Sequence, residues 1–361
     1  MGPSFRAGIG ITLDKCERLS ILLPSAICSK LRSPPERQDP ILMKVTLPLT
    51  LPALLLALAL PVFAGQPAFE PSSAWEQRLR KRAPQKAPAT PAKARKVLAF
   101  SLATGYKHWC IPHTEAVVRV IGETSGAFET VATTDIEQFR PEALAQYDAV
   151  IMNNTCPHGK DRDTFRDVLI NKVDEFGAAY KELPLPEREA LATLLYRSLV
   201  DYVSGGGGLV LLHGGITSFN HSDEFSGIVG GSFHFHPPQQ DVVLQPVNPE
   251  HPLLKPFDGK PFTHHDEPYL FNRAYPKLNF HPLLEMDLGK LKPNKRVAKL
   301  PDLPRYVAWI KRHEKGRVFF CSPSHNAQSF DQPALLAFIL GGIQYAVGDL
   351  ACADEPLSEQ K

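Results

Sequence analysis

Short apolar runs alternate with segments of helical spacing between Lys96 and Gly230, and this alternation restricts the fold more than any other feature. The apolar runs are KVLAFSLATG, FETVATT, DAVIMNNT and LVLL, and such runs are typical of strands in a parallel sheet that is covered on both faces. Helices are predicted between them, over residues 111–126, 140–147, 186–204 and 222–230. The pattern therefore predicts an α/β fold with a doubly wound parallel sheet.

The sequence changes character after Ser232, where strand-like segments are separated by Pro, Asn and Gly turns. Strands are predicted within 239–247, 262–271, 281–289, 305–313 and 317–325, and an apolar helix within 332–349. One α/β domain over residues 96–349 with a β-rich C-terminal extension accounts for this pattern. The polar, proline-punctuated stretch 157–185 is predicted to be an insertion loop, and residues 350–361 a tail.

The N-terminal quarter of the chain is predicted to contain little folded structure. Residues 43–64 have a lysine, a leucine-rich core and the end Val-Phe-Ala, the pattern of a secretory signal peptide, so we expect a protein exported to the periplasm or the extracellular space. An uncleaved anchor and a buried helix are the alternatives. Residues 1–42 would be an extension without a structural role. Residues 65–95 are rich in Pro, Ala and basic residues and are predicted to be a solvated linker.

The charge balance gives no support for nucleic-acid binding. The whole chain has a formal net charge of +2, but residues 1–64 hold seven of its 40 basic and four of its 38 acidic residues, so the remainder carries −1. No nucleic-acid partner and no nucleotide cofactor are expected. All 13 histidines lie beyond residue 64, which directs attention to metal or acid–base chemistry.

Polar residues stand where the predicted strands end. Ligands of open parallel sheets bind outside the carboxyl ends of the strands, so these residues are expected to meet at one edge. Taken singly, a histidine at such a position is more often structural, but the combination is unusual. The residues are Tyr106 and His108, Asn153 and Asn154, His213, and Ser324 and His325.

Two further segments are rich in metal-ligand side chains. SFHFHPP places His234 and His236 two residues apart, on one face of an extended segment, and THHDEPY contains Asp266, Glu267 and Tyr269. Imidazole and carboxylate are ordinary ligands of Zn²⁺, Mn²⁺ and Fe²⁺. The sequence has no HExxH spacing, so the alternative is that the acidic residues cap a turn and the histidines face solvent.

Covalent acyl transfer is a poor interpretation of the turn after the fourth predicted strand. In LLHGGIT this turn carries His213, whereas a nucleophile elbow requires Ser, Cys or Asp there. Cys110, Cys156 and Cys321 lie near strand ends, but none has the glycine-flanked setting of an elbow.

The sequence resembles the ThuA-like, or trehalose-utilisation, family. The resemblance rests on GYKHWCIPHTEAV, GGGLVLLHGG, GGSFHFHPP, HPLL, HHDEPY and GRVFFCSPSH in this order, and it extends over about residues 96–348. It implies a flavodoxin-like fold similar to class I glutamine amidotransferases without their catalytic cysteine. Two features depart from the family pattern: glycines follow His213 where the family often has alanines, and the 157–185 insertion is long.

The resemblance also implies a carbohydrate substrate, since family members occur beside dehydrogenases that make 3-keto-glycosides. The hypothesis is metal-assisted proton abstraction next to the ketone, leading to cleavage or isomerisation. The alternative is a non-catalytic sugar-binding or scaffold protein. A sugar or keto-sugar ligand, a sugar dehydrogenase of the same pathway and a second copy of the chain are the expected partners. The assigned roles are a divalent metal (Zn, Mn or Fe) on His213, His236 and Asp266, catalysis by His108, Glu267 and His325, and substrate contacts from Tyr106, Asn154 and Tyr269.

Overall fold

The computed structural model describes residues 66–159 and 161–359, and these contain a nine-stranded sheet with the order β2-β1-β3-β4-β11-β10-β9-β6-β7. Neighbouring strands from β2 to β11 are all parallel, and those from β11 to β7 are antiparallel. The predicted C-terminal strands therefore extend the same sheet, and β11 lies inside its parallel half. The strands are β1 (Lys96–Phe100), β2 (Glu129–Thr133), β3 (Ala149–Asn153), β4 (Gly208–Leu212), β6 (Gln240–Pro246), β7 (Phe262–Asp266), β9 (His281–Met286), β10 (Tyr306–His313) and β11 (Gly316–Cys321).

A second, two-stranded sheet divides one of the predicted strands. Residues 262–271 were predicted to be one strand, but the backbone leaves β7 at Asp266 and continues as β8 (Leu270–Asn272), which pairs with β5 (Ser232–Phe235). The proline at 268 cannot donate a ladder hydrogen bond, which agrees with a break at this point. Glu267 and Tyr269 consequently lie in a corner between the two sheets.

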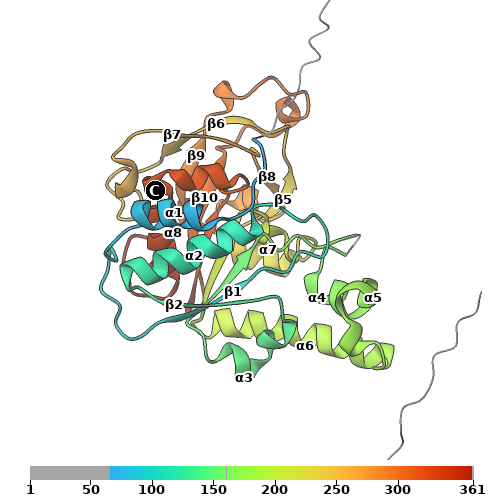
Figure 1. Cartoon of the computed structure of the whole chain (residues 1–361). Coiled ribbons are helices and arrows are strands. Elements are labelled where there is room, and N and C mark those ends of the chain that lie inside the picture. The colour runs from blue at the N-terminus through green and yellow to red at the C-terminus, as the bar shows by residue number, and fades with distance from the viewer. Residues whose placement is uncertain (1–65, 160, 360–361) are drawn as a thin grey trace, which may run out of the picture. The chain divides into compact units, whose positions relative to one another are not determined.

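Helices cover both faces of the parallel half, as the doubly wound pattern predicts. Figure 1 shows α1, α2 and α8 grouped together and α3 and α6 on the opposite side of the strands. Side chains alternate between the faces: Val97 and Ala99 join the cluster under α2 and α8, while Leu98 and Phe100 join the one under α6. The helices are α1 (Ser73–Arg82), α2 (Ile111–Ser125), α3 (Pro141–Leu144), α4 (Thr164–Arg166), α5 (Val173–Phe176), α6 (Leu185–Ser204), α7 (Asp223–Val229) and α8 (Pro333–Ala346).

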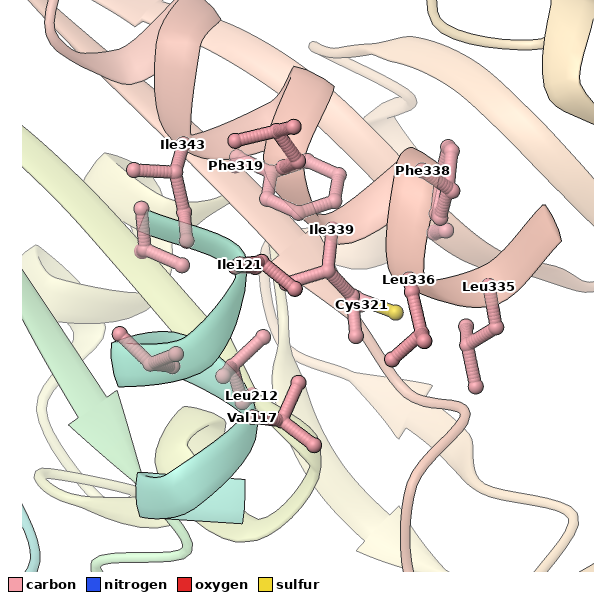
Figure 2. Close-up of a cluster of buried hydrophobic side chains, with 14 of the residues drawn as sticks. Val117, Ile121, Leu212, Phe319, Cys321, Leu335, Leu336, Phe338, Ile339 and Ile343 are labelled. Atoms are coloured by element: carbon pink, nitrogen blue, oxygen red, sulfur yellow. The ribbon is translucent and has the colours of Figure 1, made fainter. Parts of the chain in front are cut away.

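The core beneath α2 and α8 fixes the strand ends that carry the candidate site. In Figure 2, Val117 and Ile121 of α2 lie close to Leu212 of β4, and the apolar residues of α8 lie beside them. Leu212 and Cys321 are completely buried and each ends its strand. The residues that follow these strand ends therefore start from a rigid, closely packed base.

Two segments are more ordered than their composition indicates. Residues 65–95 were predicted to be a solvated linker, but they include α1, whose Trp75 and Leu79 are buried in the core. One aromatic and one leucine on the same helical face outweigh the many charged neighbours, which point to solvent. The predicted loop 157–185 contains α4, α5 and further helical turns.

Some predictions lie outside the described residues, among them the signal peptide at 43–64 and the extension 1–42. Within residues 66–159 and 161–359, no helix has the length and apolar character required to cross a bilayer.

Candidate active site

Three adjacent parallel strands end in residues with an unusual backbone conformation. Asn154 follows β3, His213 follows β4 and Ser324 comes shortly after β11, and their φ angles are 52°, 46° and 137°. Non-glycine residues rarely adopt positive φ, and such strain is concentrated at functional sites. The turn after β4 thus has the strained geometry of an elbow, and it directs an imidazole to the sheet edge.

Four side chains converge at this edge and form what we call the His/Glu cluster: His108, His213, Glu267 and His325. One ligand atom from each lies within 4.8 Å of all the others. Glu267 Oε2 is 3.3 Å from His213 Nε2 and 3.2 Å from His325 Nδ1, and these two nitrogens are 3.3 Å apart. His108 completes the cluster, with its ring centroid 5.0 Å from those of His213 and His325.

The cluster is shielded from water. Its three histidines are at most 2% exposed and Glu267 is 8% exposed. Three imidazoles and a carboxylate that face one another in such a dry setting form an ordinary donor set for a divalent transition metal.

Hydrogen bonds around the cluster fix the tautomer of His213. Its Nδ1 lies 2.7 Å from the carbonyl oxygen of Ser322, so Nδ1 carries the proton and donates it to that carbonyl. Nε2 faces Glu267 Oε2 and His325 Nδ1. A backbone carbonyl that orients an imidazole in this way is the usual support of a metal-ligating histidine.

The cluster also controls the charge of its members. Burial, together with the charges of His213 and His325, holds the pKa of His108 well below its ordinary value, so His108 is neutral. Burial alone would raise the pKa of Glu267, but hydrogen bonds from His213 and His325 hold it well below the ordinary value, so Glu267 is ionised. A lone pair on His108 and a negative charge on Glu267 both suit a bound cation.

Asp266 does not point to the cluster as a ligand, contrary to the prediction. It is fully buried, and its oxygens accept hydrogen bonds from the backbone N–H groups of Glu267 (2.7 Å), Ser324 (3.0 Å) and His325 (3.2 Å). His264 Nδ1 lies 3.1 Å from Oδ2. Asp266 therefore joins the end of β7 to the loop after β11 and positions Glu267 and His325.

His236, the other predicted ligand, lies at the border of the cluster. Its Nε2 is 3.5 Å from Glu267 Oε1, and its Nδ1 is 2.8 Å from the carbonyl oxygen of Pro237. Nδ1–H donates to that carbonyl, and the side chain is 32% exposed. His236 is therefore solvent-accessible and is not among the four atoms of the His/Glu cluster, whereas Glu267, predicted as a catalytic residue, is one of them.

The three predicted substrate contacts differ in position. Tyr106 is 62% exposed and its ring lies 4.7 Å from that of His108, so it offers a free aromatic surface beside the cluster. Tyr269 is buried against His213, with ring centroids 4.2 Å apart. Asn154 is fully buried; its amide donates to Asn153 Oδ1, and its Oδ1 accepts from the backbone N–H of Gly214, so it supports the turn after β4.

The cysteines near the strand ends are not activated. Cys110, Cys156 and Cys321 are free, buried thiols. Burial raises the pKa of Cys156 to about 12 and raises the pKa of the other two strongly. Nucleophilic catalysis requires a thiolate, so these residues do not suit acyl transfer.

The two glycines after His213 are required by close contacts. A Cβ on Gly214 would lie 2.5 Å from Cys156 Sγ and 3.0 Å from His108 Cε1, and one on Gly215 would lie 2.0 Å from the carbonyl oxygen of Met152. The departure from the alanines of the family pattern thus lets the turn approach His108 and β3 directly.

Two contributors to the site had no signal in the sequence. Gln239 Nε2 lies 2.8 Å from His325 Nε2, and the main-chain carbonyl of Ser322 orients His213. An isolated glutamine in a proline-rich stretch has no distinguishing spacing, and a backbone group has no residue type that could reveal it.

The comparisons with known proteins agree with this architecture. Residues 187–346, from α6 to α8, match the ThuA family model, described as trehalose utilisation. This part of the chain is similar to the ThuA family. A crystal structure of a protein described as ThuA-like, from Bacteroides uniformis, has a TM-score of 0.52 and 18% identity and covers 72% of this chain and 94% of its own. A second, from Parabacteroides merdae, has a TM-score of 0.47 and 16% identity and covers 74% and 100%.

The first of these structures establishes the fold, a class I glutamine amidotransferase-like α/β sandwich. No protein with a curated description matches the chain. The ThuA match includes His213, Glu267 and His325, whereas His108 lies before its first residue.

Proposed function

We propose that this protein is an exported carbohydrate-processing enzyme that uses a divalent metal to promote proton abstraction from an oxidised sugar. The match to a trehalose-utilisation family supports a sugar-related role. The convergence of four ligand atoms within 4.8 Å at the carboxyl ends of the strands carries the proposal for metal-assisted catalysis.

The donor set fits Zn²⁺, Mn²⁺ or Fe²⁺. His108, His213, His325 and Glu267 would hold the ion, His108 as a neutral imidazole and Glu267 as a carboxylate. When bound, such an ion supplies Lewis-acid stabilisation of negative charge that develops on a sugar oxygen. The chain's own residues provide the remaining chemistry.

His236 acts as the base in this proposal. Its Nε2 takes the proton from the carbon next to the ketone, and the electron pair of the C–H bond enters the carbonyl group. The electron pair then returns and expels the glycosidic oxygen from the neighbouring carbon, and the departing oxygen takes a proton from His236. Alternatively, His236 returns the proton at another carbon and the sugar is isomerised. Tyr106, with its exposed ring beside His108, stacks on the sugar and orients it.

The substrate chemistry implies a supplier. A ketone is required to acidify the proton, so an oxidising enzyme, a sugar dehydrogenase, must act before this protein.

The decisive test combines metal content and turnover. The full chain and the variants His213→Ala and Glu267→Gln are purified, their metal content is measured by mass spectrometry, and they are assayed with a 3-keto-glucoside with and without added Zn²⁺, Mn²⁺ or Fe²⁺. His313→Ala, a histidine at the distal end of β10, is the matched control.

We expect a near-stoichiometric metal in the parent chain and the control, and its loss together with activity in the two cluster variants. Absence of bound metal, with no gain of activity on adding any of the three ions, would contradict the metal proposal. Sugar binding without turnover in the metal-loaded protein would instead identify a non-catalytic sugar-binding protein.

A further inference from the structure

A second pocket, separate from the His/Glu cluster, opens beside the two-stranded sheet. Its volume is about 180 Å³, and we call it the Arg305 pocket. It lies among β8, the turn at Tyr275 and the segment that leads into β10. The lining residues that matter here are Phe271, Tyr275, Leu300, Leu303, Arg305 and Tyr306.

The pocket has a rigid aromatic wall. Tyr275 is 3% exposed; its hydroxyl donates to the carbonyl oxygen of Pro304 at 2.9 Å and accepts from the backbone N–H of Tyr306 at 2.7 Å. The ring of Phe271 lies 5.4 Å from that of Tyr275 and 5.1 Å from that of Trp309. Rings held in this way offer a preformed apolar surface.

The size of the pocket limits its occupant. A cavity of roughly 150 Å³ lined by apolar side chains is known to accept one benzene molecule. The Arg305 pocket is slightly larger, so a single six-membered aromatic ring fits it.

Arg305 adds a polar group to this apolar wall. Its side chain donates to the carbonyl oxygens of Pro301 and Leu303 and so fixes the segment that covers the pocket. The residue is only 9% exposed, and its Nε is buried without a hydrogen-bond partner. Among the described residues, no carboxylate lies within ion-pair distance of Arg305.

Nε has almost no accessible surface, so a ligand oxygen would pair with a terminal nitrogen, each of which has a second N–H beyond the one donated to Leu303 or Pro301. Glu285, Asp287 and Asp302 line a neighbouring cavity with Arg305, so the positive charge is partly balanced at longer range. A neutral hydrogen-bond acceptor on the ligand can therefore pair with Arg305, and a negative charge is not required.

We propose that the Arg305 pocket binds a single aromatic ring that carries an oxygen acceptor, such as a phenolic ether or an aryl ketone. The ring lies against Tyr275 and Phe271, and its oxygen accepts a hydrogen bond from Arg305. Such a group could arrive as a free aromatic compound or as the aryl part of a glycoside.

The position of the pocket connects it with the candidate active site. Tyr269 lines the pocket and also packs against His213 of the His/Glu cluster. The side chain of Tyr269 would therefore separate an aryl group attached to a sugar from the proposed metal. This aglycone source rests on the proposed function; the binding of the ring itself does not.

Fluorine NMR of the full chain tests the pocket without any activity measurement. The probes are para-fluoroacetophenone, which has an acceptor, fluorobenzene, which has none, and para-fluorophenol with its β-glucoside. The variants are Arg305→Gln and Leu300→Trp, which fills the pocket from a half-exposed position. Arg312→Gln, a surface arginine on β10 paired with Asp354, is the matched control.

We expect the parent chain to bind para-fluoroacetophenone about tenfold more tightly than fluorobenzene, as one good hydrogen bond would give. Arg305→Gln should remove this difference, Leu300→Trp should abolish binding of both probes, and Arg312→Gln should change nothing. A glucoside that binds more tightly than its free phenol assigns the pocket to an aglycone, and the reverse assigns it to a free aromatic compound.

Equal affinity for the two probes in the parent chain, or binding that survives Leu300→Trp, would overturn the proposal. Circular dichroism of each variant excludes loss of folding as the cause. These results are separable from the metal proposal because binding is measured in the presence of a chelator, where failure of the His/Glu cluster has no effect on the signal.

Discussion

Replacement of Asp266 by asparagine should destabilise the protein more than any other change of a single atom at the site. The carboxylate is fully buried and accepts three backbone N–H groups, from Glu267, Ser324 and His325, at 2.7, 3.0 and 3.2 Å. An asparagine in this position retains one acceptor oxygen, and its NH₂ group faces donors that it cannot satisfy. Each buried N–H left without a partner costs about 1–3 kcal/mol.

With one or two donors left unpaired, we expect the free energy of unfolding to fall by about 3 kcal/mol. Urea denaturation of the metal-free protein, followed by circular dichroism, measures this loss. Asp258→Asn is the matched control, because Asp258 is 80% exposed and pairs with Lys260 on the surface. It should change stability by less than about 0.5 kcal/mol.

The same substitution should weaken metal binding, because Asp266 holds the backbone of both Glu267 and His325. Residues that orient ligands typically affect metal affinity by about 10- to 100-fold. Zn²⁺ affinity is measured by competition with a chelator, at urea-free conditions where the variant is folded. A loss of stability below about 0.5 kcal/mol, with unchanged Zn²⁺ affinity, would refute the positioning role.

Three further changes test separate parts of the structure. Gly215→Ala should prevent folding or lower the melting temperature strongly, because the added Cβ would lie 2.0 Å from the carbonyl oxygen of Met152; a normal melting curve would contradict the close contact. Trp75→Ala should cost about 3–5 kcal/mol in urea denaturation, since Trp75 is 3% exposed in the core, whereas a solvated linker predicts almost no loss. Burial raises the pKa of Asp163 to about 6 in the folded protein, so ionisation of this residue destabilises the fold as pH rises through about 4 to 6. Asp163→Asn keeps the cap on α4 and should be more stable than the parent chain above pH 6 and equally stable below pH 4. Urea titrations at several pH values measure this difference.

Patterns of residue type predicted the fold because they depend on which faces are buried. The apolar runs of β1, β3 and β4 have all their central residues buried on both sides, and such runs look like parallel strands without further information. The β-rich extension was predicted as strands, but the placement of β11 between β4 and β10 depends on long-range pairing that no local pattern records. The docking of α1 likewise rests on two side chains whose partners are distant in the sequence.

The sequence could group residues of the candidate site, but it could not predict the direction of their side chains. His108, His213 and His325 follow strand ends, and the rule that ligands bind at the carboxyl ends of parallel strands is enough to group them. The roles of Asp266, Glu267 and His236 depend on side-chain direction at the corner between β7 and β8. Asp266 faces three backbone N–H donors, whereas the next residue, Glu267, faces three imidazoles. Alternation along a regular strand would have predicted this, but the strand ends at Asp266.

The exposed base distinguishes catalysis from binding, and His236→Asn tests it. His236 Nε2 borders Glu267 but is not among the four atoms of the His/Glu cluster, so the variant should keep its metal and its affinity for a keto-sugar. Turnover should fall by about 10²- to 10⁴-fold, the usual contribution of a general base, and kcat should fall more than KM changes. His313→Asn on β10 is the matched control and should retain full activity. If His236→Asn loses metal together with activity, His236 is a ligand after all; if it retains both, proton abstraction belongs to another group, because a variant without its general base cannot turn over at the parent rate.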